Sequence, residues 1–246
     1  MVNTEDIISS DKYIDKLNNN LALNLMLKSH ASAINILKRE LPNLEKIIPV
    51  ILNKLKKTKR ARLVYIGAGT SGRIAIQDAV ELYPTFGWPL SRIALIIAGG
   101  MKALTKSVEG SEDNCISSKV MITKNKICKH DVVIGVAASG NTPFTVDCIL
   151  QAKKRGALTV VIVNNNNSIL QKTADLSICL PTGAEVVAGS TRLKAGTAQK
   201  ICLNMISTLL MTRLGFVKNG MMINLIPSNE KLIKRKKMIK DLVNCF

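Results

Sequence analysis

Aromatic side chains make up only 3% of this 246-residue chain, although 47% of it is hydrophobic. A buried core must therefore be built mainly from Ile, Leu, Val, Ala and Met side chains. No apolar run reaches the roughly 18 residues that would predict a membrane-spanning helix. The length suits one large α/β domain, or one domain with an appendage.

Histidine is almost absent, and the cysteines follow no metal-binding pattern. His30 and His130 are the only two histidines, and neither lies near a loop that we interpret as functional. None of the six cysteines belongs to a Cys-x-x-Cys pair, so we expect small buried side chains rather than disulfides or zinc ligands. The first residues lack the basic-then-apolar pattern of a signal peptide, which predicts a cytoplasmic protein.

Acidic residues are few: 17 Asp and Glu face 35 Lys and Arg, for a formal net charge of +18. Such a charge could indicate a nucleic-acid-binding protein. However, the lysines are scattered, aromatic side chains that could stack on bases are rare, and no recognition motif is present. We therefore expect no nucleic-acid partner, and no membrane partner, but an anionic small molecule that a basic surface would attract.

The order of the elements predicts an α/β fold with a parallel sheet covered by helices on both faces. Residues 1–60 are predicted as an N-terminal helical arm, with a break at Pro42-Asn43 and a second helix beyond it. Strands are predicted at 62–66, 92–97, 131–137, 157–163 and 175–180, and helices at 70–82, 112–124, 142–155 and 191–214. In such sheets, ligands bind beyond the carboxyl ends of the strands.

Three segments follow from this order: the arm at 1–60, a domain at 61–216 and a C-terminal helical segment at 217–246. Residues 216–227 are predicted to be a connecting segment rich in Gly, Asn and Met. Ser228, Asn229 and Glu230 are predicted to cap a final helix whose lysines and arginine form a solvated basic face.

The first predicted strand runs directly into a glycine-rich turn, residues 67–72, and then into a helix. The free N–H groups and positive end of such a helix favour a bound anion. The spacing matches Gly-x-Gly-x-x-Gly, but the acid expected for a dinucleotide is missing after the second strand, at residues 98–102. Because Thr70 and Ser71 can bond a terminal phosphate, we favour a phosphate monoester. The alternative is a turn that merely packs the helix on the strand.

Two later loops repeat this chemistry. Residues 139–142 follow the third strand, where Ser139, Asn141 or Thr142 could bind the same phosphate or simply cap the next helix. In the third loop, Ser190 or Thr191 could cap the long helix that follows. Lys194 lies in its first turn, where a cation is mildly unfavourable and a bound anion would offset its charge. The alternative for Lys194 is ordinary surface charge.

The loops resemble the sugar isomerase (SIS) domain, and several further blocks resemble the N-acetylmuramic acid 6-phosphate etherases. The matching blocks are residues 65–73, 78–81 with 84–87, 97–100, 108–113, 137–140 with 142–143, 189–200 and 228–232. Their number and order make this resemblance more specific than the glycine turn. It implies a flavodoxin-like SIS domain, a phosphosugar substrate, a homodimer and no metal or other cofactor.

The resemblance also implies a reaction and the residues that perform it. The D-lactyl ether at C3 of the phosphosugar is cleaved by elimination and then addition of water. Glu81 falls on the family's acid position and Glu112 on its base position, whereas Glu109 and Glu185 are equally visible acids. The implied substrate-binding residues are Gly69, Thr70, Ser71, Gly72, Ser139, Gly140, Thr142, Ser190 and Lys194.

The proposed acid lies far from the first loop along the chain. Glu81 lies nine residues beyond Gly72, or roughly 13 Å along a straight helix, which is long for one hexose. Either Pro84 turns the chain back toward the loop, or Glu81 acts on a substrate held by a partner subunit, which is our hypothesis.

The chain departs from the family pattern at two places. It has Leu82-Tyr83-Pro84 where the family usually has Cys-Pro-Pro after the acid, and it ends at Phe246 where the family usually continues as a small helical domain. A phosphosugar-binding regulator without activity is therefore the alternative function. An SIS isomerase is a weaker alternative, because no histidine stands near the loops.

Overall fold

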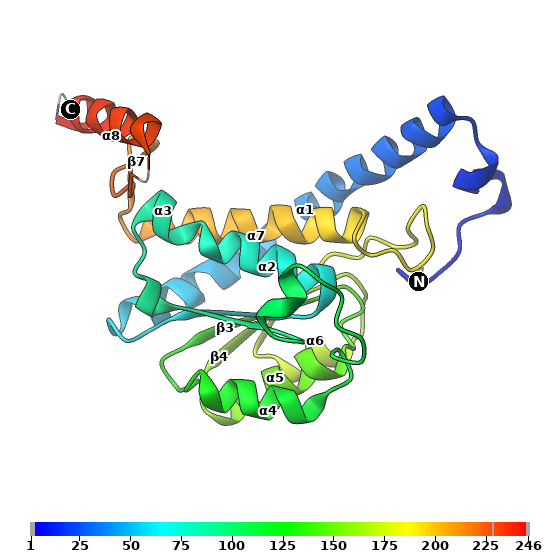
Figure 1. Cartoon of the computed structure of the whole chain (residues 1–246), viewed down its shortest axis with the longest axis horizontal. Coiled ribbons are helices and arrows are strands. Elements are labelled where there is room, and N and C mark those ends of the chain that lie inside the picture. Colours follow the sequence, from blue (N-terminus) through cyan, green and yellow to red (C-terminus); the bar gives the residue numbers. More distant parts are fainter. Residues whose placement is uncertain (1–2, 228, 245–246) are drawn as a thin grey trace.

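Five parallel strands form the centre of the molecule, in the order β2-β1-β3-β4-β5 (Figure 1). The structure, a computed structural model, describes residues 3–227 and 229–244. It confirms all the predicted strands, with slightly displaced ends. The strands are β1 (Leu63–Gly67), β2 (Ile93–Ile97), β3 (Val132–Ala137), β4 (Leu158–Val163) and β5 (Leu176–Cys179).

The strand order changes direction between β1 and β3, which pair in parallel from Leu63 opposite Val132 onward. From β1 the chain first adds β2 on one side and then returns to add β3, β4 and β5 on the other. All residues of β1 and β3 are buried, because helices cover both faces of the sheet. The crevice at this change of direction is where open α/β sheets bind their ligands.

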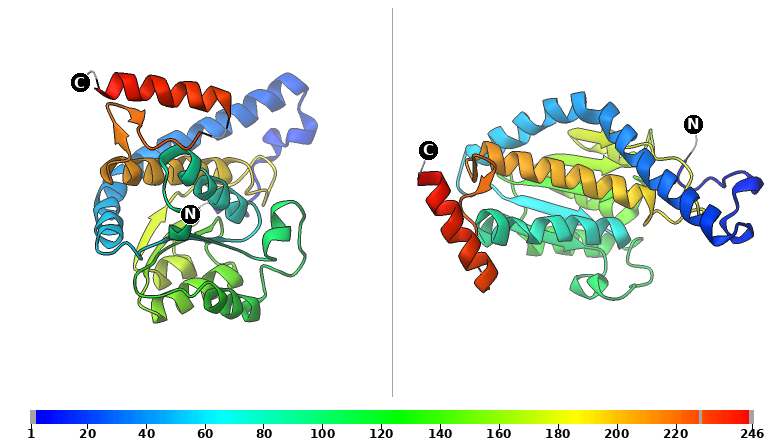
Figure 2. Two further views of the ribbon diagram at one scale, coloured as in Figure 1. Left: turned by 60° about the vertical axis from the view of Figure 1, so that its left-hand side comes forward. Right: turned by 90° about the horizontal axis from the view of Figure 1, so that it is seen from above.

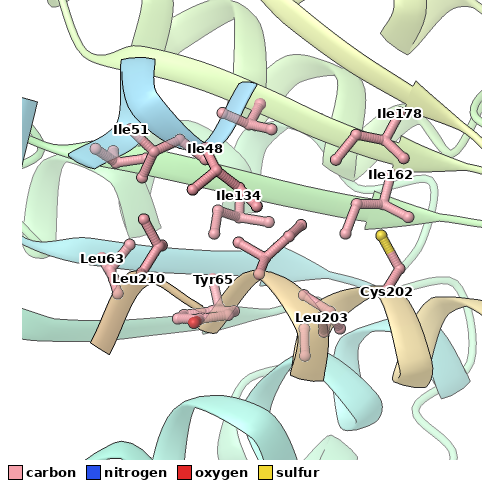
Figure 3. Close-up of a cluster of buried hydrophobic side chains, with 14 of the residues drawn as sticks. Ile48, Ile51, Leu63, Tyr65, Ile134, Ile162, Ile178, Cys202, Leu203 and Leu210 are labelled. Atoms are coloured by element: carbon pink, nitrogen blue, oxygen red, sulfur yellow. The ribbon is translucent and has the colours of Figure 1, made fainter. Parts of the chain in front are cut away.

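Helices cover both faces of the sheet, as the sequence predicts (Figures 1 and 2). Helices α1 (Asn19–Lys56), α2 (Gly69–Val80) and α7 (Lys194–Arg213) lie on one face. Helices α4 (Cys115–Lys124), α5 (Pro143–Lys154) and α6 (Ile169–Thr173) lie on the other. On the face covered by α1, α2 and α7, the side chains of Ile48, Ile51 and Leu203 pack over strand residues such as Ile134 (Figure 3).

Helix α1 confirms the predicted N-terminal helical arm, but the break predicted within it at Pro42-Asn43 is wrong. It continues through Pro42 and Pro49 as one helix of 38 residues. A proline inside a helix removes one hydrogen bond and is unfavourable by itself. Both prolines lie on the exposed side, while Leu37, Leu44 and Ile47 are buried on the other. Packing of this apolar stripe against α7 and the sheet outweighs the local cost.

The segment after α7 contains a small hairpin that the sequence interpretation missed. Strands β6 (Val217–Lys218) and β7 (Met221–Met222) pair antiparallel around Asn219 and Gly220. Both turn residues have positive φ, at 50° and 74°, as expected for a two-residue Asn-Gly turn.

Helix α8 (Glu230–Asn244) then projects from the body (Figure 2). The N–H of Leu232 donates to Asn229 Oδ1 at 3.0 Å, so Asn229 caps this helix. The predicted contribution of Ser228 lies outside the described residues.

The remaining elements are short. Helix α3 (Leu82–Phe86) follows α2, and 3-10 turns occupy Ser10–Lys12, Ile14–Lys16, Leu90–Arg92 and Met101–Leu104. Among the described residues, no helix is both long and apolar enough to cross a membrane.

Candidate functional site

The first loop starts helix α2 against the end of strand β1. A Cβ on Gly67 would lie only 2.7 Å from the Cα of Gly72, so the turn and the helix approach too closely for a side chain there. Gly69 has a φ of 53°, which glycine adopts readily. The hydroxyls of Thr70 and Ser71 make no hydrogen bond within the described part of the chain. They and the first N–H groups of α2 are therefore available to an anion.

In the second loop, the Thr142 hydroxyl has no hydrogen-bond partner among the residues that the structure describes. Ser139 Oγ accepts from the N–H of Asn141 at 3.1 Å, and Asn141 Oδ1 accepts from the N–H of Ile169 at 2.9 Å. Thr142 occupies the N-cap position of α5, but its side chain makes no capping hydrogen bond. Helix capping therefore accounts for neither Ser139 nor Thr142, although the sequence left that alternative open.

Glu112 joins these two loops. Its Oε1 atom would lie 2.8 Å from a Cβ on Gly69, and its backbone carbonyl accepts from the N–H of Phe144 at 2.9 Å. The predicted helix from 112 begins only at Cys115, because Asn114 Oδ1 caps it. Glu112 therefore lies in a loop at the crevice between β1 and β3, with an exposed side chain, and not in a helical first turn.

The third loop is held by a buried carboxylate. Glu185 is fully buried, and its two oxygens accept from the N–H groups of Lys194 at 3.1 Å and Ala195 at 2.8 Å. The prediction that Ser190 or Thr191 caps the long helix is wrong, because α7 begins later, at Lys194, and Glu185 provides the anion at its positive end.

Lys194 also stabilises this loop from within. Its Nζ donates to the carbonyl of Ala184 at 2.9 Å, and its side chain is largely buried. Burial lowers the pKa of Lys194, and the nearby Glu185 charge opposes that shift. A Cβ on Gly196 would lie 3.6 Å from Thr70 Cγ2, so the start of α7 adjoins the first loop.

Replacing Glu185 with Ala should therefore destabilise the protein by roughly 2–5 kcal/mol, since the buried N–H groups of Lys194 and Ala195 lose their acceptor and the Lys194 charge loses a nearby opposite charge. Urea denaturation monitored by circular dichroism measures this loss. Glu109→Ala, at an exposed acid, is the matched control and should leave the midpoint unchanged. Equal midpoints for the two variants would contradict the assigned role of Glu185.

Glu81 stands apart from the loops within one chain. Helix α2 is 12 residues long, so Glu81, which directly follows it, lies about 18 Å along the helix from Gly69. In Figure 1, α2 starts at the right-hand end of the sheet and α3 follows at the left-hand end. Pro84 lies inside α3, which does not lead back to the first loop.

The Glu81 side of the molecule has a cavity of about 290 Å³ between α2, α3 and α7. Asp78 forms part of its wall and is buried. Asp78 Oδ1 accepts from Asn204 Nδ2 at 2.7 Å and from Ser207 Oγ at 2.9 Å, and Oδ2 accepts from the Tyr65 hydroxyl at 3.3 Å. Burial raises the pKa of Asp78, while these donors and the Lys200 charge oppose the rise. Sequence reasoning missed this network, whose members lie far apart in the chain.

The position of His30 differs from the expectation drawn from the sequence. Its Nδ1 lies 2.9 Å from Thr197 Oγ1 in the first turn of α7. The expectation that neither histidine stands near a candidate loop is therefore wrong for His30. No spacing in the sequence connects the two, because α1 and α7 meet only through tertiary packing. Within the described residues, no group of three or more His, Cys, Asp or Glu side chains could hold a metal ion.

Comparison with known proteins adds independent information. Residues 44–153 match the glucokinase regulatory protein N-terminal SIS domain, and residues 116–209 match the SIS domain. The chain is 41% identical to the N-acetylmuramic acid 6-phosphate etherase of Mycoplasma mycoides subsp. mycoides SC, across 99% of this chain and 80% of the relative. It is 44% identical to that of Lactococcus lactis subsp. lactis, across 83% of this chain and 69% of the relative.

Solved structures share the fold. An Escherichia coli CFT073 protein superposes with a TM-score of 0.61 at 19% identity, covering 83% of this chain and 97% of the other. A phosphoheptose isomerase from Francisella tularensis gives a TM-score of 0.59 at 12% identity, covering 80% of this chain and all of the other. The predicted SIS-type fold is confirmed.

Proposed function

We propose which residues perform each step of the reaction, on the premise that the chain belongs to the N-acetylmuramic acid 6-phosphate etherase family. The enzyme is a carbon–oxygen lyase. It cleaves the D-lactyl ether of N-acetylmuramic acid 6-phosphate to N-acetylglucosamine 6-phosphate and D-lactate, in cell-wall amino sugar recycling.

The substrate phosphate binds where the loops after β1 and β3 meet. Gly69, Thr70, Ser71 and Gly72 offer backbone N–H groups and two hydroxyls at the positive end of α2. Ser139, Gly140 and Thr142 approach the phosphate from the neighbouring strand, and Ser190 approaches it from the third loop. Lys194 contributes by holding this third loop through the Ala184 carbonyl. These groups bind and orient a dianion without any metal ion.

Glu112 is the base. In the open-chain sugar the C1 aldehyde acidifies the C2 proton, so a carboxylate can remove it before the C3–O bond breaks. Water then adds to the double bond at C3. The observation that carries this assignment is the position of the Glu112 carboxylate, 2.8 Å from where a Gly69 Cβ would be. A sugar whose phosphate lies on the first loop would have its C2 carbon within reach of this group.

Glu81 is the acid that protonates the departing lactate oxygen, and it acts on the substrate bound to the other subunit of a homodimer. The length of α2 supports this arrangement, because Glu81 and the phosphate loop of one chain are at opposite ends of the helix. The two carboxyls must be in opposite protonation states, and separate subunits would give them different surroundings.

A lactate-release assay on N-acetylmuramic acid 6-phosphate tests the proposed chemistry. Purified protein should release one D-lactate for each N-acetylglucosamine 6-phosphate formed, without added metal. Tight binding of N-acetylglucosamine 6-phosphate with no lactate release would instead indicate a phosphosugar-binding regulator. The proposed location is the cytoplasm, because a doubly charged phosphosugar does not cross a bilayer unaided.

A further inference from the structure

The leaving group of the proposed reaction has its own charge. D-lactate carries a carboxylate on the same carbon as the ether oxygen that Glu81 is proposed to protonate. That carboxylate must therefore lie close to Glu81 when the C3–O bond breaks. A carboxylate that leaves water for a protein cavity is unfavourable unless a cation or several hydrogen-bond donors accompany it. The Glu81 cavity should contain such a group if Glu81 has this role.

Lys200 is the one cation among the described residues that line the Glu81 cavity. It projects from α7, whereas Glu81 lies at the junction of α2 and α3, so the two side chains face the cavity from different elements. Lys200 is exposed, and no described carboxylate lies within ion-pair distance of it. Its charge is therefore available to an anionic ligand.

The existing contacts of Lys200 orient it without neutralising it. Lys200 Nζ donates to Asn204 Oδ1, and Asn204 Nδ2 donates to Asp78 Oδ1 at 2.7 Å. Asp78 also accepts from Ser207 and Tyr65, so its oxygens are already occupied by neutral donors. The hydrogen-bond network around Asp78 thus holds the Lys200 ammonium group in place through Asn204 and leaves its further N–H donors for a ligand.

The remaining walls of the cavity suit the methyl group of lactate. Ile74, Leu82 and Phe86 line the same space, and its volume of about 290 Å³ exceeds what a lactyl group needs. The cavity therefore combines an acid, a cation and an apolar wall. These three features match the ether oxygen, the carboxylate and the methyl group of a D-lactyl ether.

We propose that Lys200 binds the D-lactyl carboxylate of the substrate and makes the enzyme selective for charged lactyl ethers. This inference rests on the proposed role of Glu81 and adds a specificity-determining residue to it. The sugar phosphate is held by one subunit, and the lactyl end enters the Glu81 cavity of the other.

The test compares two substrates and two variants. Wild-type enzyme should prefer the natural substrate over an analogue with a lactyl carboxamide by roughly 10- to 100-fold in kcat/KM, the contribution expected of a charge-assisted hydrogen bond. Lys200→Met should remove this preference by lowering kcat/KM for the carboxylate alone. Lys200→Arg should keep most of it. Binding of N-acetylglucosamine 6-phosphate, which has no lactyl group, should be unchanged in both variants.

Lys119→Met is the matched control, since Lys119 is exposed on α4, on the other face of the sheet. It should behave as wild type on both substrates. A Lys200→Met enzyme that still prefers the carboxylate, while Glu81→Gln is inactive, would overturn the role of Lys200 and leave the acid assignment standing. Full activity of Glu81→Gln would overturn the acid assignment itself and this inference with it.

Discussion

Replacing Glu112 with Gln should reduce lactate release by roughly 10²- to 10⁴-fold, the usual contribution of a positioned general base. The amide has the same shape as the carboxyl but cannot accept the C2 proton. Binding of N-acetylglucosamine 6-phosphate should be retained, because the phosphate contacts lie in the loops after β1 and β3. Steady-state lactate release and isothermal titration calorimetry measure the two effects.

Glu109→Gln is the control for this experiment, since it removes an exposed acid from the same loop. Its activity should equal that of wild type. If Glu109→Gln lost activity while Glu112→Gln kept it, the base would have been assigned to the wrong carboxylate.

Replacing Glu81 with Gln should also reduce lactate release by roughly 10²- to 10⁴-fold, because an unprotonated alkoxide leaves slowly. The two variants should differ in one respect. In D₂O, Glu81→Gln should still exchange the C2 hydrogen of the substrate through the intact Glu112, whereas Glu112→Gln should not. Proton NMR of the recovered substrate reports this exchange. Exchange in neither variant would contradict this order of steps, in which Glu112 removes the C2 proton before Glu81 protonates the lactate oxygen.

The fold could be predicted from local patterns because each strand is a short apolar run that ends at a turn. The break predicted at Pro42 was wrong for a physical reason. The unfavourable effect of a proline is local, whereas the burial of Leu37 and Leu44 on either side of it depends on α7. Packing that involves distant residues cannot be weighed from a window of sequence.

Some residues of the candidate site could also be predicted from local patterns, whereas others could not. Thr70, Ser71 and Thr142 follow strand ends, where topology alone brings residues together at one edge of a sheet. Glu112 and Glu81 were singled out only by resemblance to a family. The cap that Glu185 provides and the Asp78–Asn204 contact depend on tertiary structure, because the latter pair is separated by 126 positions. No periodicity in the sequence reports such pairs.

The central claim is that one site uses Glu112 of one subunit and Glu81 of another, and mixed dimers test it most directly. Subunits carrying Glu81→Gln and subunits carrying Ser71→Tyr should each be inactive as homodimers. Purified heterodimers should regain close to half of wild-type lactate release, because one of their two sites then combines an intact loop with an intact Glu81. Verified heterodimers without lactate release would contradict the claim and place both carboxyls in the same chain.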